Sequence, residues 1–450
     1  MNKKIKLISF LTLTGLVLIS LSSCKKKFMD GINDNPNQPI AVTPMVILPA
    51  VEAAIAYAQG GDVSRYTSIF LQQVTGASRQ AQSYNMYSFI AGDFDNLWKG
   101  NLYAGPMANL NDLIKESTDK GYTHYKGVAE VLMAYTLGMT TDLWGSVPYS
   151  DAFKGADQLQ PVYDDQQTIY ASIHSLIAAA KIDLAATNGG PLVPGSEDMM
   201  FGGDVTLWLK FANALNARFY IHESKLSPTT AATNALAAIA AGGFGSMTDD
   251  AQFNFAAGAT TANPWYQFND QRGDITFDGF LLDTMVALTD PRVDVYFDTA
   301  AQWIGLYYGD ESSPVFYMTY FEQKFIEAEA NQILGNSAAA QTAYAAAITE
   351  SMDKMGVLPA NYAAYLVANG TLTGTQQNKL DQIMMQKYIA MFLHPEAWSD
   401  FRRSNVPALT PVTGSAIPRR FMYPLSENSF NAPNVPAGAN LFTPRLWWDL

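Results

Sequence analysis

The feature that most restricts the fold is a helical hairpin pattern between residues 321 and 355. Apolar and small side chains recur at helical spacing on both sides of Gly335 and Asn336. The second half of the pattern places five side chains on one helix face: Tyr344, Ala347, Ile348, Ser351 and Met352. A Gly-Asn step between two such patterns marks a turn. Because a hairpin must pack on other helices to bury its apolar faces, the pattern predicts a mainly α-helical protein.

Helical spacing recurs along most of the chain. We expect helices over 49–58, 62–74, 126–139, 164–185, 204–222 and 380–392, with Asp62 and Asp204 as N-caps. The hairpin at 321–355 is about as long as a tetratricopeptide unit, roughly 34 residues, but no strict repeat of it follows. The sequence therefore predicts a TPR-like helix–turn–helix scaffold.

Two long segments lack this periodicity. Residues 242–310 and 404–450 are rich in Gly, Pro, Asn and aromatic residues. Long connections in a compact domain are commonly functional. We expect both segments to fold over the helices as one loop-rich lobe.

The single cysteine, Cys24, follows a secretory signal. Lys3, Lys4 and Lys6 precede an apolar run from Leu7 to Leu21, and Ser22 and Ser23 lead into the cysteine. This order resembles a bacterial lipobox and predicts a signal peptide over 1–23, lipidation at Cys24 and a tether over 24–42. One cysteine excludes disulfides, and no later apolar run reaches the about 18 residues needed to span a bilayer.

Charge and motifs exclude several functions. The formal net charge of −13 opposes nucleic-acid binding, which needs a basic face. Signatures of metalloproteases, P-loop enzymes and serine hydrolases are absent, so we expect no catalytic residue, no metal and no cofactor. Only 15% of the residues are charged, which suits a neutral polar ligand.

Aromatic residues in polar surroundings are the candidate ligand contacts. A flat ring covers the apolar face of a sugar while neighbouring Asn, Gln and Asp side chains bond its hydroxyls. Most aromatic side chains belong to the core instead, and that alternative stays open for each position. The candidates are Tyr84, Tyr87, Trp265, Trp303, Tyr307 and Tyr308.

Strings of residues in a consistent order resemble the SusD/RagB outer-membrane lipoproteins of Bacteroidetes. They include "DGINDNPNQP", "YKGVAEVLMAYTLGMTTDLWGSVPYSDAF", "WLKFANALNARFY", "NPWYQF", "FIEAEA", "EAWSDFRRS" and "IPRRFMYPLSENSFN". Each string alone is weak, but together they cover nearly the whole chain.

The resemblance implies a single α-rich domain over residues 43–450, in which the loop-rich lobe carries the ligand site. It also implies a lipid-anchored protein at the outer membrane that binds oligosaccharide. It further implies delivery to a SusC-like TonB-dependent barrel, without catalysis. Three alternatives remain open from the sequence: a peptide-binding RagB-like lid, a TPR-like envelope scaffold and a lipoprotein glycosidase. The strings are mainly scaffold in this family, so the resemblance assigns no ligand-binding residues.

Overall fold

The computed structural model describes residues 42–300 and 303–450. The predicted signal peptide, Cys24 and the predicted tether up to residue 41 lie outside the described residues. Residues 44–450 form one compact unit. Within the described part of the chain, no helix combines the length and apolarity needed to cross a membrane.

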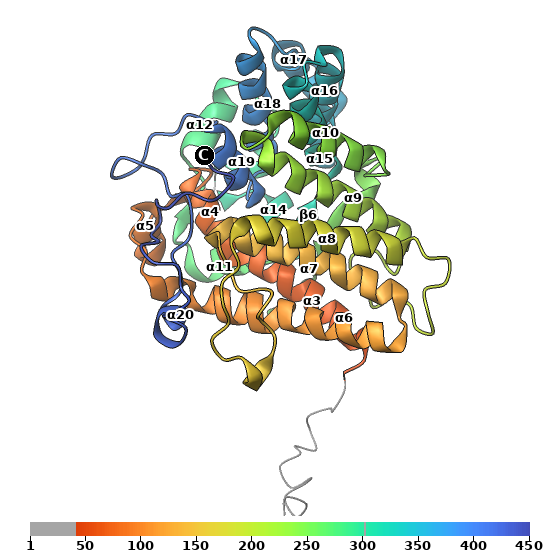
Figure 1. Ribbon diagram of the computed structural model, residues 1–450. Helices are drawn as coiled ribbons and strands as arrows, with labels where there is room; N and C mark the ends of the chain where they lie inside the picture. The colour runs from red at the N-terminus through yellow and green to blue at the C-terminus, as the bar shows by residue number, and fades with distance from the viewer. Residues whose placement is uncertain (1–41, 301–302) are drawn as a thin grey trace, which may run out of the picture. The chain divides into compact units, whose positions relative to one another are not determined.

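Helices dominate this unit, which confirms the mainly α prediction (Figure 1). Its first half contains α3 (Pro44–Ala58), η1 (Gln59–Val63), α4 (Ser64–Phe70), α5 (Arg79–Asn85), η2 (Ala91–Phe94), η3 (Leu97–Met107), α6 (Ala108–Lys120), α7 (Thr123–Trp144), η4 (Gly155–Asp157), α8 (Gln166–Leu184), α9 (Val205–His222), η5 (Glu223–Lys225) and α10 (Pro228–Ala240). Its second half contains η6 (Met247–Asp249), α11 (Pro264–Arg272), α12 (Phe280–Ala287), α13 (Val293–Tyr296), α14 (Leu306–Gly309), α15 (Tyr320–Ile333), α16 (Ser337–Lys354), α17 (Pro359–Asn369), α18 (Gln376–Ala390), α19 (Glu396–Ser404) and α20 (Leu425–Phe430).

The strands are short and form antiparallel pairs. The pairs are β1 (Thr75–Gly76) with β3 (Ile275–Thr276), β2 (Ala251–Asn254) with β6 (Pro314–Met318), and β4 (Phe297–Asp298) with β5 (Trp303–Ile304). The first two pairs join segments that are far apart in sequence, whereas β4 and β5 are a local pair within one loop.

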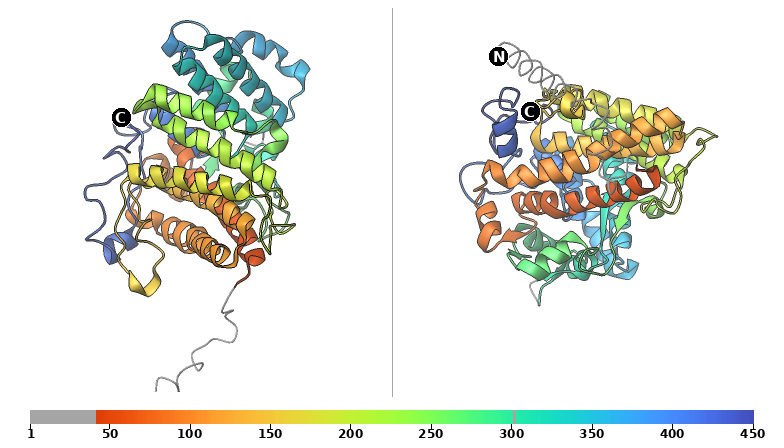
Figure 2. Two further views of the ribbon diagram at one scale, coloured as in Figure 1. Left: turned by 45° about the vertical axis from the view of Figure 1, so that its right-hand side comes forward. Right: turned by 90° about the horizontal axis from the view of Figure 1, so that it is seen from below.

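The predicted hairpin is confirmed as α15 and α16. Gly335 adopts a φ of 78° at the turn between them, a conformation that favours glycine. The five side chains predicted to share a face of the second helix are all buried. The helices α7 and α8, and α9 and α10, pack as further sequential pairs, which Figure 2 shows from two sides.

The two predicted N-caps have different outcomes. Asp204 caps α9 as expected, because its side chain accepts hydrogen bonds from the backbone N–H groups of Thr206 and Leu207. The prediction for Asp62 is wrong. The helix kinks at Gly61, directly before Asp62, but the Asp62 side chain accepts no hydrogen bond from the backbone of the described residues and instead forms an ion pair with Arg65.

The segment 242–310 is less irregular than predicted. It contains α11 to α14 and four of the short strands, each too short to show a clear periodicity in the sequence. The segment 404–450 contains one short helix, α20. The two segments approach each other at Gln72, whose carbonyl accepts from the backbone N–H of Leu281 and whose side chain donates to the carbonyl of Thr410. Their union into one lobe stays a prediction.

Buried ion pairs connect the helices at the centre of the unit. Arg403 on α19 pairs with Glu329 on α15 at 2.6 Å and with Asp400 at 2.5 Å. Lys387 on α18 pairs with Asp400 at 2.7 Å. Because buried charges are costly unless they are paired, these contacts fix the relative positions of α15, α18 and α19.

Gly138 allows α7 and α9 to approach closely. A Cβ atom at this position would lie 2.1 Å from the ring of Phe219. We therefore expect Gly138→Ala to lower the free energy of unfolding by about 1–3 kcal/mol through overpacking, measured by urea denaturation. The control is Gly100→Ala in η3, where nothing lies within 4 Å of the added atom. If the two variants were equally stable, α7 and α9 would not be packed as closely at Gly138 as the structure shows.

Candidate functional site

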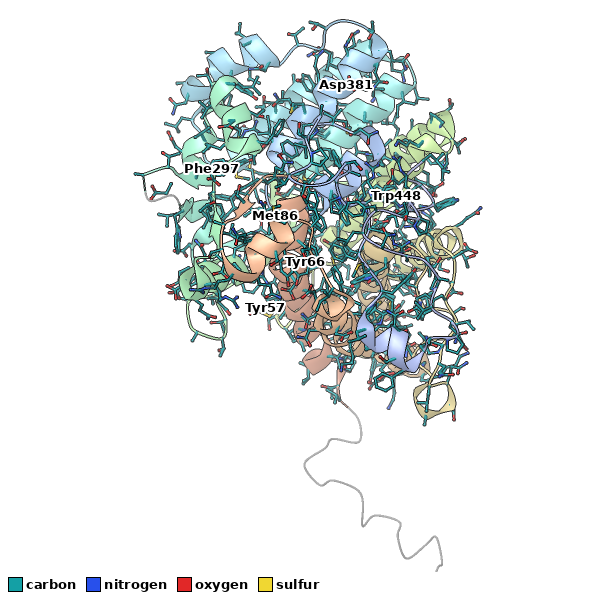
Figure 3. All side chains as sticks on the ribbon, turned by 90° about the vertical axis from the view of Figure 1, so that its left-hand side faces the viewer. Tyr57, Tyr66, Met86, Phe297, Asp381 and Trp448 are labelled. Carbon is teal, nitrogen blue, oxygen red and sulfur yellow. The ribbon has the colours of Figure 1, made fainter. Side chains whose placement is uncertain are left out.

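A polar cleft opens between the start of α4 and the side of α11. We call it the polar cleft; its volume is about 140 Å³. Its lining comes from α3, η1, α4, η3 and α11 and comprises Tyr57, Gly61, Asp62, Arg65, Asn101, Pro264, Gln267, Phe268 and Gln271. Figure 3 labels Tyr57, from the cleft lining, and Tyr66, one residue beyond Arg65 on α4.

Two π-helical stretches build one wall of the cleft. In η1, Gly61 leaves helical geometry with φ −91° and ψ −114°, and the following turn presents Asp62 and Arg65. The stretch η3 supplies Asn101. π-Helical turns are rare and occur frequently at functional sites, because their widened turn re-aims side chains. The two π-helical stretches thus lie in the same region as the cleft, which supports a functional role for it.

The helix α11 builds the opposite wall. Asn263 caps it by accepting from the backbone N–H groups of Trp265 and Tyr266, and Pro264 occupies its first turn. Four lining residues follow at i, i+3, i+4 and i+7 and therefore share one face: Pro264, Gln267, Phe268 and Gln271.

Charge in the cleft is balanced. Arg65 forms an ion pair with Asp62, and its guanidinium carbon lies 4.4 Å from the centre of the Phe268 ring. Arg272 approaches the same ring at 5.8 Å and pairs with Asp274 at 3.0 Å. Two guanidinium groups therefore lie within 6 Å of the centre of the half-buried Phe268 ring, which lines the cleft.

Several polar groups in the cleft retain hydrogen-bonding capacity. Asp62 is the only hydrogen-bond partner of Arg65 within the described part of the chain, so further N–H groups of the guanidinium are free. The side chains of Asn101 and Gln271 form no hydrogen bond to any described residue. In contrast, the Tyr57 hydroxyl donates to Gln267 at 3.0 Å, which fixes the exposed ring of Tyr57 at the edge of the cleft.

A small recess adjoins the cleft and shares three of its lining residues: Asp62, Arg65 and Phe268. Its volume is about 40 Å³, enough for a few non-hydrogen atoms. The rest of its lining is mixed: it contains apolar and aromatic residues (Tyr66, Ile69, Ala81, Tyr84 and Ile275) and polar or charged ones (Gln80, Arg272 and Asp274).

Of the predicted ligand contacts, Tyr84 lies in this recess. Its ring stacks on Phe89 at 4.2 Å, and its hydroxyl donates to Asp93 at 3.2 Å. Burial raises the pKa of the Tyr84 hydroxyl above its usual value. Tyr87 points elsewhere: its ring packs near Phe442 and its hydroxyl accepts from the backbone N–H of Val412.

Two of the other four predicted aromatics lie at a different cavity of about 30 Å³. Trp265 and Tyr308 line it. Both are buried, and the Trp265 indole donates to the Ser64 hydroxyl at 2.8 Å. Tyr307 packs beside Tyr308 at 5.2 Å and is half-buried, and Trp303 is half-buried on β5. The structure thus brings together Trp265, Tyr307 and Tyr308, while Tyr84 and Tyr87 lie apart from them in different surroundings.

Most residues of the polar cleft were missed by the sequence reasoning. Gln267 and Phe268 follow Trp265 within residues 242–310, for which the sequence predicts a loop. A signal for a helix was present, because Asn263 followed by Pro264 is a typical N-cap and first-turn pair. A helix starting there would have placed Gln267, Phe268 and Gln271 on one face and directed Trp265 to another.

The described residues form a scaffold of paired helices, and this scaffold carries a polar cleft with aromatic side chains in its walls. This combination is typical of a helical protein that binds a ligand. No group of metal-ligating side chains gathers among the described residues. A family model described as SusD-like, starch-binding and associating with the outer membrane matches residues 36–424, and the chain belongs to this family. The resemblance found in the sequence is thereby confirmed.

Several solved structures have the same fold. A chitin-binding SusD homolog from Flavobacterium johnsoniae is 24% identical, with a TM-score of 0.77 over 90% of this chain and 97% of that one. A SusD homolog from Bacteroides ovatus is 21% identical, with a TM-score of 0.77 over 90% and 99% of the two chains. A SusD/RagB family protein from Bacteroides thetaiotaomicron is 22% identical, with a TM-score of 0.73 over 91% and 99%. Among curated protein sequences, none matches this chain.

Proposed function

We propose that this protein binds a neutral oligosaccharide in the polar cleft without catalysing its cleavage. The observation that carries the proposal is the free hydrogen-bonding capacity of Arg65, Asn101 and Gln271 beside the rings of Phe268 and Tyr57. Sugar hydroxyls need such donors and acceptors, and an aromatic face covers the apolar side of a sugar ring. The balanced charge of Arg65 and Asp62 favours a neutral ligand over an ionic one.

The recess favours a sugar that carries an N-acetyl group. Ile69 and Ala81 in its lining suit a methyl group, and Arg65 and Asp62, which the recess shares with the cleft, suit an amide. The chitin-binding activity named for the Flavobacterium johnsoniae homolog agrees with this choice. Tyr84, as a lining residue of the recess, is the predicted aromatic that contributes to this proposed site.

The family and the sequence also support a proposal for the location and the partner of the protein. A family that associates with the outer membrane, and a predicted lipidated Cys24, support a lipid-anchored protein at that membrane. We propose that the bound oligosaccharide passes to a SusC-like TonB-dependent barrel. Capture by two stacking contacts and a few hydrogen bonds gives a Kd in the micromolar to millimolar range, which allows release.

The test is calorimetry of the purified protein with chitin, cello- and malto-oligosaccharides of equal length. We expect saturable binding, tightest for the chitin oligomer. Chitin and cello-oligosaccharides share one backbone and differ by the N-acetyl groups, so their comparison isolates the recess. We expect Arg65→Met to weaken binding at least ten-fold, because a charged hydrogen bond contributes about 1.5–3 kcal/mol.

The matched control is Arg445→Met. Arg445 is 51% exposed and is not part of the cleft lining, so we expect unchanged affinity. Absence of binding to every oligosaccharide would reject the proposed function. Binding that survives Arg65→Met would reject the cleft as its site.

A further inference from the structure

A second and larger concavity lies along η3. We call it the aromatic groove; its volume is about 360 Å³, within the range of ligand pockets. Its lining residues are Trp98, Lys99, Tyr103, Ala104, Ala108, Pro148, Ala152, Phe153, Pro161, Ser426, Glu427 and Phe430. None of these residues lines the polar cleft.

The aromatic walls are held in place before any ligand binds. Trp98 and Tyr103 lie 4.7 Å apart, and Tyr103 and Phe153 lie 6.1 Å apart between ring centres. The Tyr103 hydroxyl donates to the carbonyl of Pro148 at 2.8 Å. Phe430 is 76% exposed, which is unfavourable for so large an apolar side chain. A ligand in the groove would cover it.

One carboxylate lies among these rings. Glu427 accepts hydrogen bonds from the Trp98 indole at 3.3 Å, the Tyr163 hydroxyl at 2.8 Å and the Asn431 amide at 3.1 Å. All three donors are neutral, and Glu427 has no ion-pair partner among the residues described. Its negative charge is therefore fixed in position and is not neutralised by a neighbouring cation.

The other charged residue of the lining is Lys99. It is exposed and forms no ion pair with any described residue. A lysine ammonium is strongly hydrated and sits on a flexible stem, so it can remain in solvent. The hydrogen-bonded carboxylate, in contrast, cannot move away from the rings.

We propose that the aromatic groove binds an organic cation with a ring-sized apolar body. Aromatic faces attract an ammonium group, and the Glu427 carboxylate adds a fixed opposite charge. The polar side chains of the lining other than Trp98 and Tyr103 are Lys99, Ser426 and Glu427, too few for the many hydroxyls of an oligosaccharide. The groove therefore takes a ligand of a different class from that proposed for the polar cleft.

The test compares phenethylamine, a cation at neutral pH, with 2-phenylethanol, a neutral molecule with the same body. Calorimetry of the full chain is expected to show at least ten-fold tighter binding of the amine, a difference of about 1.4 kcal/mol. Equal affinities would overturn the cation proposal. Absence of saturable binding for both would overturn the groove as a ligand site.

Two variants locate the binding. Glu427→Gln is expected to bring the ratio of the two affinities close to one, because an amide keeps an acceptor and removes the charge. Phe430→Ala, at an exposed position, is expected to weaken the binding of both ligands. Arg65→Met, in the polar cleft, is the control and should leave both affinities unchanged; loss of amine binding in this variant would contradict an independent site.

Discussion

Replacing Arg403 by methionine is expected to lower the free energy of unfolding by about 3–5 kcal/mol. Arg403 bridges Glu329 and Asp400 and also donates to the carbonyl of Ile221 at 3.1 Å. All of these groups are buried, so the variant leaves Glu329 without its cationic partner in a low-dielectric interior. Urea denaturation followed by circular dichroism measures the loss.

Two further variants separate this mechanism from a general effect of losing an arginine. Arg445→Met removes an exposed arginine that lies 3.7 Å from Asp449, and we expect a change of no more than about 0.5 kcal/mol. Adding Glu329→Gln to Arg403→Met should recover part of the lost stability, because it removes the unpaired charge. A double variant no more stable than the single one would contradict the electrostatic explanation.

The helical scaffold could be predicted from the sequence because its signals are local. The spacing of apolar residues in 204–222 and the Asp204 side chain are sufficient to specify α9 and its start. The same holds for α15 and α16, where the Gly335 turn separates two amphipathic faces. Asp62 shows the limit of this reasoning, because its role depends on how α3 continues into α4 through η1.

The candidate site could be predicted only in part, because its walls come from distant segments. Polar residues surround Trp265 in the sequence, which is typical of a ligand contact. In the structure its indole is buried and donates a hydrogen bond to Ser64, about 200 residues away. Arg65, Asn101 and Phe268 come from three different elements and meet only after folding. No sequence spacing connects them, so the sequence could indicate aromatic ligand contacts but not the ones that converge.

The strongest pH dependence of stability is expected at Glu52 on α3, close to the start of η1. Glu52 is buried, and its carboxyl accepts from the backbone N–H of Met199 at 2.8 Å. Neighbouring Asp198 accepts four hydrogen bonds, from Met200, Phe201, Gly203 and the Trp208 indole. Glu52, in contrast, accepts one hydrogen bond, and its other carboxyl oxygen has no hydrogen-bond partner among the described residues.

Burial, with the charge of Asp198 added to it, raises the pKa of Glu52 from 4.5 to about 10. The folded state thus binds this proton more tightly than the unfolded state does. The resulting stabilisation is complete below about pH 4.5 and is lost as the pH rises towards 10. Between pH 5 and 9 we expect the free energy of unfolding to fall by an amount on the order of a few kcal/mol.

Glu52→Gln tests this dependence, because the amide resembles the neutral acid and cannot ionise. Urea denaturation at pH 5 and pH 9 should show a much smaller difference for the variant than for the wild-type protein. Asp112→Asn, an exposed substitution on α6, should keep the wild-type difference. If Glu52→Gln retains the full difference, Glu52 does not hold the proton. The alkaline loss of stability would then have to arise from another buried group, such as Glu130, whose pKa burial raises to about 7.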